Sequence, residues 1–375
     1  MAVDKRGRKL PKGIRQRGNT FEGRFMYNGC SYAVKGETVT ETQKNMTELK
    51  YQLMHGQYIA RTNITFDQWF NEWIDDYIKP RRKLGTLQTY QWLYNGAVRN
   101  AMGNIPLQNL TVDSIEQIYK KLQKQHGYSD GSMEVIRAMI KGCLKVALKK
   151  QLIKNNPAAL ADLPQVKGQE KKKRLAMTKE QQALFMQYAA DNYLYNLFGV
   201  LLRTGLRNGE IRGLKYSDID RKNNVLHIRR TIKYVVSVGM VEDTPKSKTS
   251  IRDIPLTDDL KKIFDAQKRD YAFKIENING YIFTDPEGTA LDDQILNREI
   301  DRIVCAIRAA GHEFPDITAH VFRHTFATRA IEAGMPPQVL KTIMGHSSLG
   351  MTMDLYSHVM PDVKAQEMEK IANIF

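Results

Sequence analysis

The sequence predicts a multidomain protein that is mainly α-helical and carries small β-sheets. Its 375 residues exceed what one ordinary core accommodates, so two or three domains are expected. Near the N-terminus polar and apolar residues alternate as in strands. In the next hundred residues apolar positions recur with the period of a helix. From about residue 178 helices lie on both sides of a β-rich stretch. We therefore expect domains at 1–60, 63–163 and 178–375, a linker at 164–177, and a tail from about 362.

The first domain is predicted to be a three-stranded sheet backed by a helix. Aromatic and polar residues alternate in "FEGRFMYNGCSYAVKG", where Asn28-Gly29 is a strong hairpin-turn signal. Residues 40–58 then have a helical pattern. Four basic residues can share one sheet face: Arg15, Arg17, Arg24 and Lys35. A two-stranded ribbon fits the major groove, so this face is expected to contact DNA. The alternative is a small structural module with a solvated basic face.

The second domain is predicted to be all-helical. "TFDQWFNEWIDDYI" places its aromatic and aliphatic residues on one helical stripe, which indicates a buried core. Thr65 is the expected N-cap, with Gln68 at the capping-box position. Between helices, Arg81 and Arg82 of "KPRRKLGT" are candidates for phosphate contacts. In the linker, Lys171 and Lys172 belong to a basic run that is either merely solvated or crosses a DNA backbone.

The composition favours a polyanionic partner. Lys and Arg outnumber Asp and Glu by 57 to 41, a formal charge of +16, and nucleic acid is the commonest reason for such an excess. A merely soluble basic protein remains the alternative. The three cysteines are widely spaced and odd in number, so buried free thiols are expected. No apolar run approaches the ~20 residues that span a bilayer, which favours an intracellular protein.

Two histidines four residues apart, in "HVFRH" at 320–324, raise the question of a zinc site. A zinc-hydrolase helix needs a glutamate after its first histidine, but the intervening residues here are Val, Phe and Arg. A permanent guanidinium beside Zn²⁺ is also electrostatically unfavourable. His320 and Arg323 share a helix face, and their chemistry suits a phosphate. The segment therefore indicates an anion site.

Further motifs accompany this segment in a fixed order. "TGLRNGE" precedes it, "SKTSIRDIP" lies in the β-rich stretch, and "MGHSS" and "DLYSH" follow. With these residues the chain resembles the tyrosine recombinase family, most closely the integrases of temperate phages and Gram-positive conjugative transposons. The resemblance covers nearly the whole chain. It implies an arm-type DNA-binding domain, a helical SAM-like core-binding domain and a mixed α/β catalytic domain.

The resemblance assigns roles residue by residue. The implied catalytic residues are Arg207, Lys248, His320, Arg323, His346 and Tyr356, the last being the nucleophile. Glu210 matches an acidic residue that supports the site from behind, and His324 is expected to pack or to act indirectly. Lys246 lies close enough to compete with Lys248 for the role of general acid. Tyr356 follows His346 by ten positions, one more than in several well-studied members.

The implied reaction is attack of a tyrosine on a DNA phosphodiester, giving a 3′-phosphotyrosyl bond and a free 5′-hydroxyl. No metal, nucleotide or other cofactor is required. By resemblance the enzyme integrates and excises a mobile element, acting as a homotetramer on core and arm-type sites of double-stranded DNA through a Holliday junction. An excisionase and a host DNA-bending protein are candidate partners. The location implied is the bacterial cytoplasm, at the nucleoid when DNA is bound.

Two other functions would use the same residues differently. A type IB topoisomerase-like enzyme would share the chemistry without exchanging strands, although the arm-like domain argues against it. A non-catalytic DNA-binding regulator would need none of the reactive groups, and all of them are present. The amphipathic tail at 362–375 is expected to dock on a neighbouring subunit.

Overall fold

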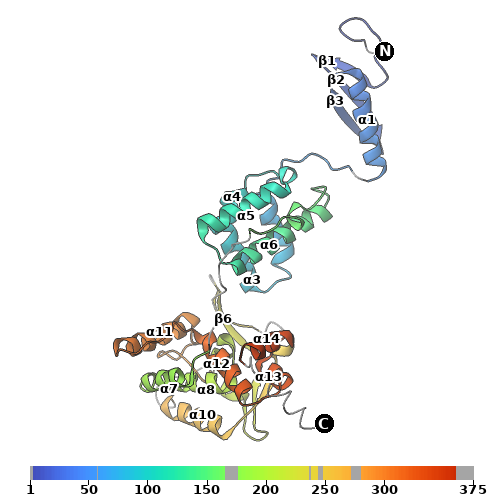
Figure 1. Cartoon of the computed structure of the whole chain (residues 1–375). Coiled ribbons are helices and arrows are strands. Elements are labelled where there is room, and N and C mark those ends of the chain that lie inside the picture. Colours follow the sequence, from blue (N-terminus) through green and yellow to red (C-terminus); the bar gives the residue numbers. More distant parts are fainter. Residues whose placement is uncertain are drawn as a thin grey trace, which may run out of the picture. The chain divides into compact units, whose positions relative to one another are not determined.

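The computed structural model describes residues 3–56, 58–164, 176–235, 238–243, 248–271 and 280–359. Its contacts divide the chain into two units, residues 1–168 and 169–375 (Figure 1). The linker residues Lys171 and Lys172, the alternative lysine Lys246 and the tail at 362–375 lie outside the described residues.

The N-terminal sheet and helix are confirmed. Strands β1 (Ile14–Arg17), β2 (Thr20–Tyr27) and β3 (Cys30–Gly36) form an antiparallel sheet in that order, and α1 (Val39–Met54) packs on one face. The β2–β3 turn is made by Asn28 (φ 43°) and Gly29 (φ 77°), as a tight hairpin turn requires. A Cβ at Gly23 would lie 2.4 Å from the Met46 sulfur, so glycine lets α1 approach the sheet.

Helices follow in the same unit, as predicted. They are α2 (Phe66–Trp73), α3 (Leu84–Leu93), α4 (Arg99–Met102), α5 (Val112–His126) and α6 (Asp130–Lys149), with π-turns at Ile74–Ile78 and Tyr94–Val98. Thr65 and Gln68 form the expected capping box of α2. The aromatic stripe is core, because Phe66, Trp69, Phe70 and Trp73 are at most 3% exposed.

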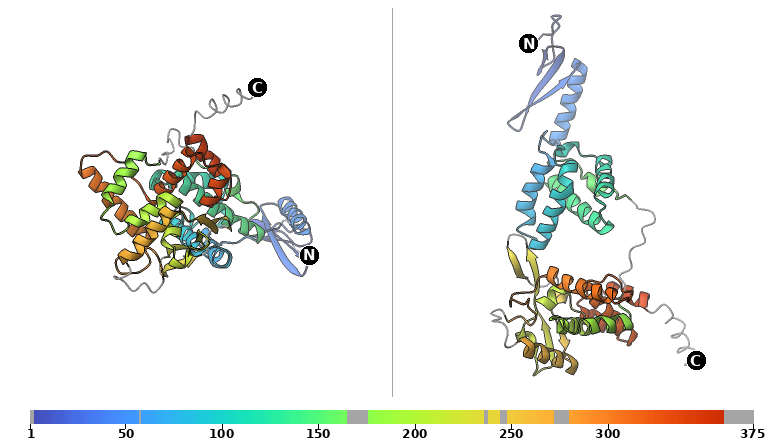
Figure 2. Two further views of the ribbon diagram at one scale, coloured as in Figure 1. Left: turned by 90° about the horizontal axis from the view of Figure 1, so that it is seen from below. Right: turned by 90° about the vertical axis from the view of Figure 1, so that its left-hand side faces the viewer.

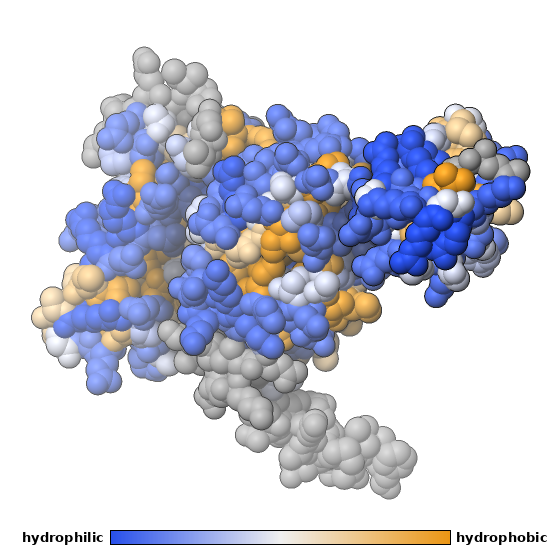
Figure 3. Space-filling model, turned by 90° about the horizontal axis from the view of Figure 1, so that it is seen from above, coloured by the Kyte–Doolittle hydropathy of each residue, from blue (hydrophilic) through white to orange (hydrophobic). Residues whose placement is uncertain are grey.

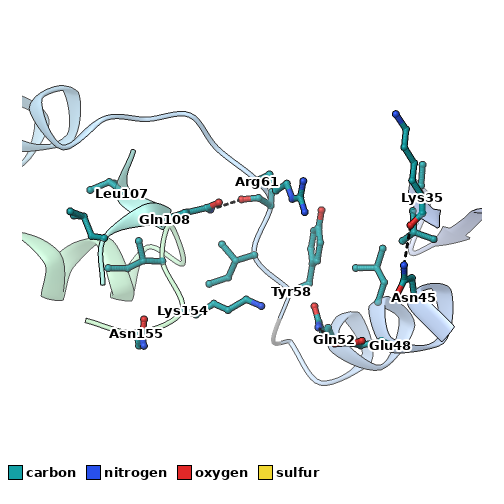
Figure 4. A pocket seen from close by; sticks show the side chains of 17 residues that line it. Lys35, Asn45, Glu48, Gln52, Tyr58, Arg61, Leu107, Gln108, Lys154 and Asn155 are labelled. Atoms are coloured by element: carbon teal, nitrogen blue, oxygen red, sulfur yellow. Dashed lines mark hydrogen bonds between the residues drawn. The ribbon is translucent and has the colours of Figure 1, made fainter. Parts of the chain in front are cut away.

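The segment after Tyr58 is anchored to this helical region by Gln108 (Figure 4). The Gln108 amide donates to the carbonyls of Ala60 (2.9 Å) and Leu152 (3.0 Å). Its carbonyl accepts from the backbone N–H of Thr62 at 3.4 Å. One side chain therefore satisfies backbone groups of two loops and ties these loops together.

The second unit is mixed α/β. Its first helices are α7 (Lys179–Tyr188), α8 (Tyr195–Thr204) and α9 (Asn208–Arg212). A small sheet has the order β4 (Ile219–Asp220), β5 (Val225–Ile228), β8 (Arg252–Pro255), and β6 (Thr231–Val235) pairs with β7 (Gly239–Asp243) as a hairpin. Then come α10 (Asp258–Tyr271), α11 (Asp293–Ala309), α12 (Ala319–Glu332), α13 (Pro337–Met344) and α14 (Gly350–Val359). The predicted helix–strand–helix order is confirmed.

The core of this unit forms where α8 and α12 run side by side (Figures 1 and 2). Phe198 of α8 stacks on Phe322 of α12 with ring centroids 5.4 Å apart, and Phe185 of α7 meets both rings edge-on. A second, smaller cluster joins α12, α13 and α14. These two clusters fix the ends of the helices that carry the candidate site.

The surface drawn in Figure 3 is mostly hydrophilic, with smaller hydrophobic areas between. Within the described residues no helix has the length and apolar character needed to cross a membrane. The expectation of buried thiols is correct for Cys143 and wrong for Cys30 and Cys305, which are exposed. Both exposed cysteines occupy polar positions, one at a strand end and one on the outer face of α11, so wide spacing in sequence did not imply burial.

Candidate active site

Three arginines from separate elements converge on the C-terminal end of α13. Consecutive backbone carbonyls there each accept a hydrogen bond from a different guanidinium. The pairs are Arg252 with Ile343, Arg323 with Met344 (2.7 Å) and Arg207 with Gly345 (2.7 Å). The last carbonyls of a helix have no partner within it and carry the negative end of its dipole. The helix end therefore satisfies its own acceptors by holding three cations in one place.

A tight turn positions Arg207. Gly205 ends α8 with a left-handed φ of 60°, and a Cβ there would lie 2.4 Å from the Phe326 ring. Only glycine fits this turn without strain. The Gly205 carbonyl accepts a hydrogen bond from Arg323 at 2.6 Å. The motif "TGLR" thus places Arg207 and supports Arg323 through the same backbone turn.

Glu210 is buried and contacts both Arg207 and Arg252. Its side chain is 2% exposed and accepts from Arg207 (2.7 Å) and from both terminal nitrogens of Arg252 (2.9 and 3.2 Å). Burial alone would raise the pKa of the carboxyl, but hydrogen bonds from Arg252 and the charges of Arg252 and Arg207 lower it. Glu210 is therefore ionised and links two of the guanidiniums.

Arg252 is a residue that the sequence reasoning missed. Its side chain is 3% exposed and lies on β8, where buried and exposed residues alternate from Arg252 to Pro255. The sequence pattern that could have indicated it is an arginine at a position of a short strand that the alternation makes buried. A buried cation needs an anionic or dipolar partner, so such an arginine indicates a charged cluster. Here it has both, in Glu210 and the end of α13.

The cluster keeps an excess of positive charge. Three guanidiniums face one carboxylate, a balance of 3 − 1 = +2. Burial, followed by the charge of Arg207, lowers the pKa of Arg323 to about 9, which leaves it charged at neutral pH. The Arg207 side chain is 36% exposed and opens the cluster to solvent. Such a site suits an anion with several oxygens, such as a phosphodiester.

His346 follows Gly345 directly and belongs to the same cluster. It is 6% exposed, and its Nδ1 lies 2.9 Å from Oγ1 of Thr352. Burial, then the charges of Arg323, Arg207 and Arg252, lowers the pKa of the imidazole to about 4. The ring is therefore neutral at neutral pH and carries a proton on one nitrogen only.

The two histidines of "HVFRH" lie on α12. His320 is exposed in the first turn, one turn before the buried Arg323. The His320 and His324 rings meet at right angles with centroids 4.7 Å apart. Among the described residues, no three His, Cys, Asp or Glu side chains are grouped as metal ligands would be.

Tyr356 lies on α14, with its ring against the small cluster that includes Phe326 and Met335. Its hydroxyl donates a hydrogen bond to the backbone carbonyl of Met335. Burial raises the pKa of the phenol. In this state the hydroxyl is protonated and held by the turn between α12 and α13.

Lys248 begins the 3₁₀ turn Lys248–Ser250 that leads into β8. The hydroxyl of Ser250, at the end of this turn, accepts a long hydrogen bond from Arg207 at 3.5 Å. The Ser250 backbone carbonyl accepts a second hydrogen bond, from Arg252 at 3.0 Å, so the turn reaches the arginine cluster. The structure does not describe the Lys248 side chain, so the choice between Lys248 and Lys246 stays a prediction.

The basic residues predicted in the first unit fall into two groups. Arg15, Arg17 and Arg24 surround one carboxylate, Glu22, at 2.8, 3.2 and 2.9 Å. Lys35 of β3 lies opposite Glu22 of β2 in the strand register. All four basic residues therefore share the sheet face opposite α1. Arg81 and Arg82 lie elsewhere, in the loop after Ile78, where Arg81 covers the Tyr77 ring at 5.7 Å.

The low pKa of His346 predicts a pH dependence of stability. Between pH about 6.5 and about 4 the unfolded imidazole binds a proton and the folded one does not, so the wild type loses stability as pH falls through this window. His346→Gln removes this contribution, at most about 3 kcal/mol. Urea unfolding at pH 7 and pH 4.5 should show a smaller loss for the variant. Equal losses in both proteins would contradict a neutral His346.

Comparison with known proteins identifies the family of this chain. The phage integrase family model matches residues 175–362, and a phage integrase N-terminal SAM-like domain matches residues 65–123. A XerC-like tyrosine recombinase of Caldanaerobacter subterraneus is 24% identical over 91% of both chains. The ICEBs1 integrase of Bacillus subtilis is 23% identical over 91% of this chain and 93% of its own.

Solved structures show the same fold. The Tn1549 transposon integrase in complex with transposon right end DNA superposes with a TM-score of 0.73 at 25% identity, covering 82% of this chain and 99% of that one. A lambda integrase tetramer bound to a Holliday junction has a TM-score of 0.59 at 17% identity, covering 93% and 95%. The chain thus belongs to the phage integrase family and is a tyrosine recombinase, an enzyme that cleaves and rejoins DNA at specific sites.

Proposed function

We propose that this recombinase integrates and excises a mobile element, with Tyr356 as the nucleophile and the arginines at the end of α13 as the phosphate site. The observation that carries the proposal is the convergence of Arg207 and Arg323, with a surplus of positive charge, beside the helix that follows His346 and bears the tyrosine. Relatives named as a transposase from transposon Tn916, the ICEBs1 integrase and the integrase of Staphylococcus phage L54a support the mobile element as substrate.

The first chemical requirement is an ionised phenol. Its ordinary pKa near 10 means that ionisation at pH 7 costs about 4 kcal/mol. Burial of Tyr356 adds to this cost while its hydroxyl stays on the Met335 carbonyl. Moving α14 so that the hydroxyl reaches the cationic cluster would lower it, with His320 as the proton acceptor. The contact with Met335 therefore represents a resting state.

The second requirement is stabilisation of the negative charge that builds on the non-bridging oxygens. Guanidiniums already fixed by carbonyls need no reorganisation when that charge develops, which is the usual source of the largest catalytic contribution. Arg207 and Arg323 each use two nitrogens on protein acceptors, which leaves further N–H groups of each fork for a phosphate. His346 adds a neutral donor.

The third requirement is a proton for the departing 5′-oxygen, a role assigned here to Lys248. The phosphotyrosyl bond keeps the energy of the phosphodiester, so a 5′-hydroxyl from a partner strand reverses the attack without ATP or another cofactor. By analogy with the lambda integrase tetramer on a Holliday junction, exchange takes place in a tetramer on two duplexes. An excisionase and a host DNA-bending protein remain predicted partners.

The domains divide the binding task. Residues 1–60 would bind arm-type sites through the sheet face, and 63–163 would bind the core site together with the catalytic domain 178–375. Glu22 holds three arginines on the exposed sheet face, and hydrogen bonds from Arg15 and Arg24 lower the pKa of its carboxyl. Arg81 and Arg82, together with Lys171 and Lys172 of the linker, are candidates for phosphate contacts near the core site.

Tyr356→Phe should abolish covalent attachment to DNA. The variant keeps the ring in its cluster and loses the hydroxyl, so folding should change by no more than about 1 kcal/mol. The measurement is the protein–DNA adduct on a nicked duplex that traps the cleaved strand, with binding followed by mobility shift. Tyr195→Phe, at an exposed position of α8, is the matched control and should react normally. An adduct that persists in Tyr356→Phe would show that the nucleophile is misassigned.

Replacing Arg15 and Arg24 by Ala should weaken arm-site binding and flatten its salt dependence. Each lost phosphate contact reduces the slope of log K against log salt by about 1. Lys44→Ala is the control, because Lys44 is exposed on α1, on the opposite side of the sheet. Fluorescence anisotropy across a salt series provides the slopes. Identical slopes for the double variant and the control would rule out this face as a phosphate-binding surface.

A further inference from the structure

Thr352 is a buried polar residue beside the candidate site to which the sequence assigned no role. It lies in the first turn of α14 and is 0% exposed. Its Oγ1 is 2.9 Å from Nδ1 of His346, which is 6% exposed. Within the described part of the chain, this imidazole is the hydrogen-bond partner of the Thr352 hydroxyl.

The direction of this hydrogen bond follows from the needs of a buried hydroxyl. A hydroxyl has one proton to donate, and leaving that proton without an acceptor in the interior is unfavourable. The acceptor available to Thr352 among the described residues is the His346 Nδ1. Thr352 therefore donates, Nδ1 accepts, and the single proton of the neutral ring resides on Nε2.

A proton on Nε2 is what a phosphate-binding histidine needs. The Nε2–H form donates to a non-bridging oxygen, whereas the other tautomer would present a lone pair to an anion. Partners of the second ring nitrogen commonly fix tautomer and orientation in this way. Burial, followed by the charges of the surrounding arginines, lowers the pKa of the imidazole and keeps the ring neutral, so only one of its nitrogens carries a proton.

We propose that Thr352 is a positioning residue that holds His346 as the Nε2–H tautomer, aimed at the scissile phosphate. The inference rests on the proposed role of His346. Thr352 also lies four residues, one helical turn, before Tyr356 on α14. One helix therefore carries both the nucleophile and the hydroxyl that orients the imidazole, so both are placed by the same element.

The test is a double-mutant cycle on single-turnover cleavage of the trapping duplex. Thr352→Val replaces the hydroxyl with a methyl of similar size and should slow cleavage about 10- to 100-fold, as the loss of the hydrogen-bond partner of a metal-binding histidine does. DNA affinity should stay within about threefold. Thr352→Ser keeps the hydroxyl and should restore the rate to within about threefold of wild type. In a His346→Ala background, Thr352→Val should add less than about twofold.

Two readouts separate this role from a purely structural one. A Thr352→Val effect of equal size with and without His346 would mean that Thr352 acts through helix packing, which overturns the inference. Nitrogen chemical shifts of His346, assigned with the His346→Ala variant, should show Nε2–H in the wild type and a mixture in Thr352→Val. A proton on Nδ1 in the wild type would overturn it directly.

The failure of the inference is distinguishable from failure of the proposed function. If His346→Ala cleaves at the wild-type rate, the role of His346 fails and the inference fails with it. If His346→Ala is slow and Thr352→Val is not, the site assignment stands and only the positioning role of Thr352 is wrong.

Discussion

The catalytic unit depends on the hydrogen bonds between three guanidiniums and the last carbonyls of α13. Arg252 and Arg323 are almost fully buried, and an unpaired charge in that position would be strongly unfavourable. The helix end offers acceptors that have no other partner, and Glu210 supplies a formal negative charge. The two stabilise each other: the guanidiniums donate hydrogen bonds to carbonyls that have no partner within the helix, and the carbonyl dipoles stabilise the buried positive charges.

This constraint explains why separated stretches of sequence meet. The end of α13 is reached by Arg207, the N-cap of α9, by Arg252 of β8 and by Arg323 of α12, and glycines permit the approach. A Cβ at Gly345 would lie 3.1 Å from both Arg252 Nη1 and the Thr249 carbonyl, and its φ of 62° favours glycine independently. Because α13 leads directly through His346 to α14, the same helix end that binds the arginines also sets where the imidazole and the tyrosine helix begin.

Sequence reasoning reached the parts of the fold that local pattern encodes. The hairpin at Asn28-Gly29, the cap at Thr65 and the aromatic core of α2 follow from spacing and turn chemistry. The convergence of Arg207 and Arg323 was reached through a family resemblance rather than through periodicity. Arg252, Thr352 and the contact between Tyr356 and the Met335 carbonyl were missed, because each depends on which distant backbone group lies opposite, and no local pattern encodes that. The exposure of Cys30 and Cys305 was missed for a different reason, because wide spacing in sequence excludes a disulfide framework without implying burial.

The most direct test of the account is to remove the phosphate charge that the arginines are said to balance. Cleavage by wild type and Arg323→Ala is measured on a phosphodiester and on a methylphosphonate, in which a neutral methyl replaces a charged non-bridging oxygen. The same protein preparations are used on both substrates, so any loss of folded protein cancels in the ratio. The account predicts a loss of at least about 100-fold for the variant on phosphate and a loss at least about tenfold smaller on methylphosphonate. Equal losses on both substrates would contradict it.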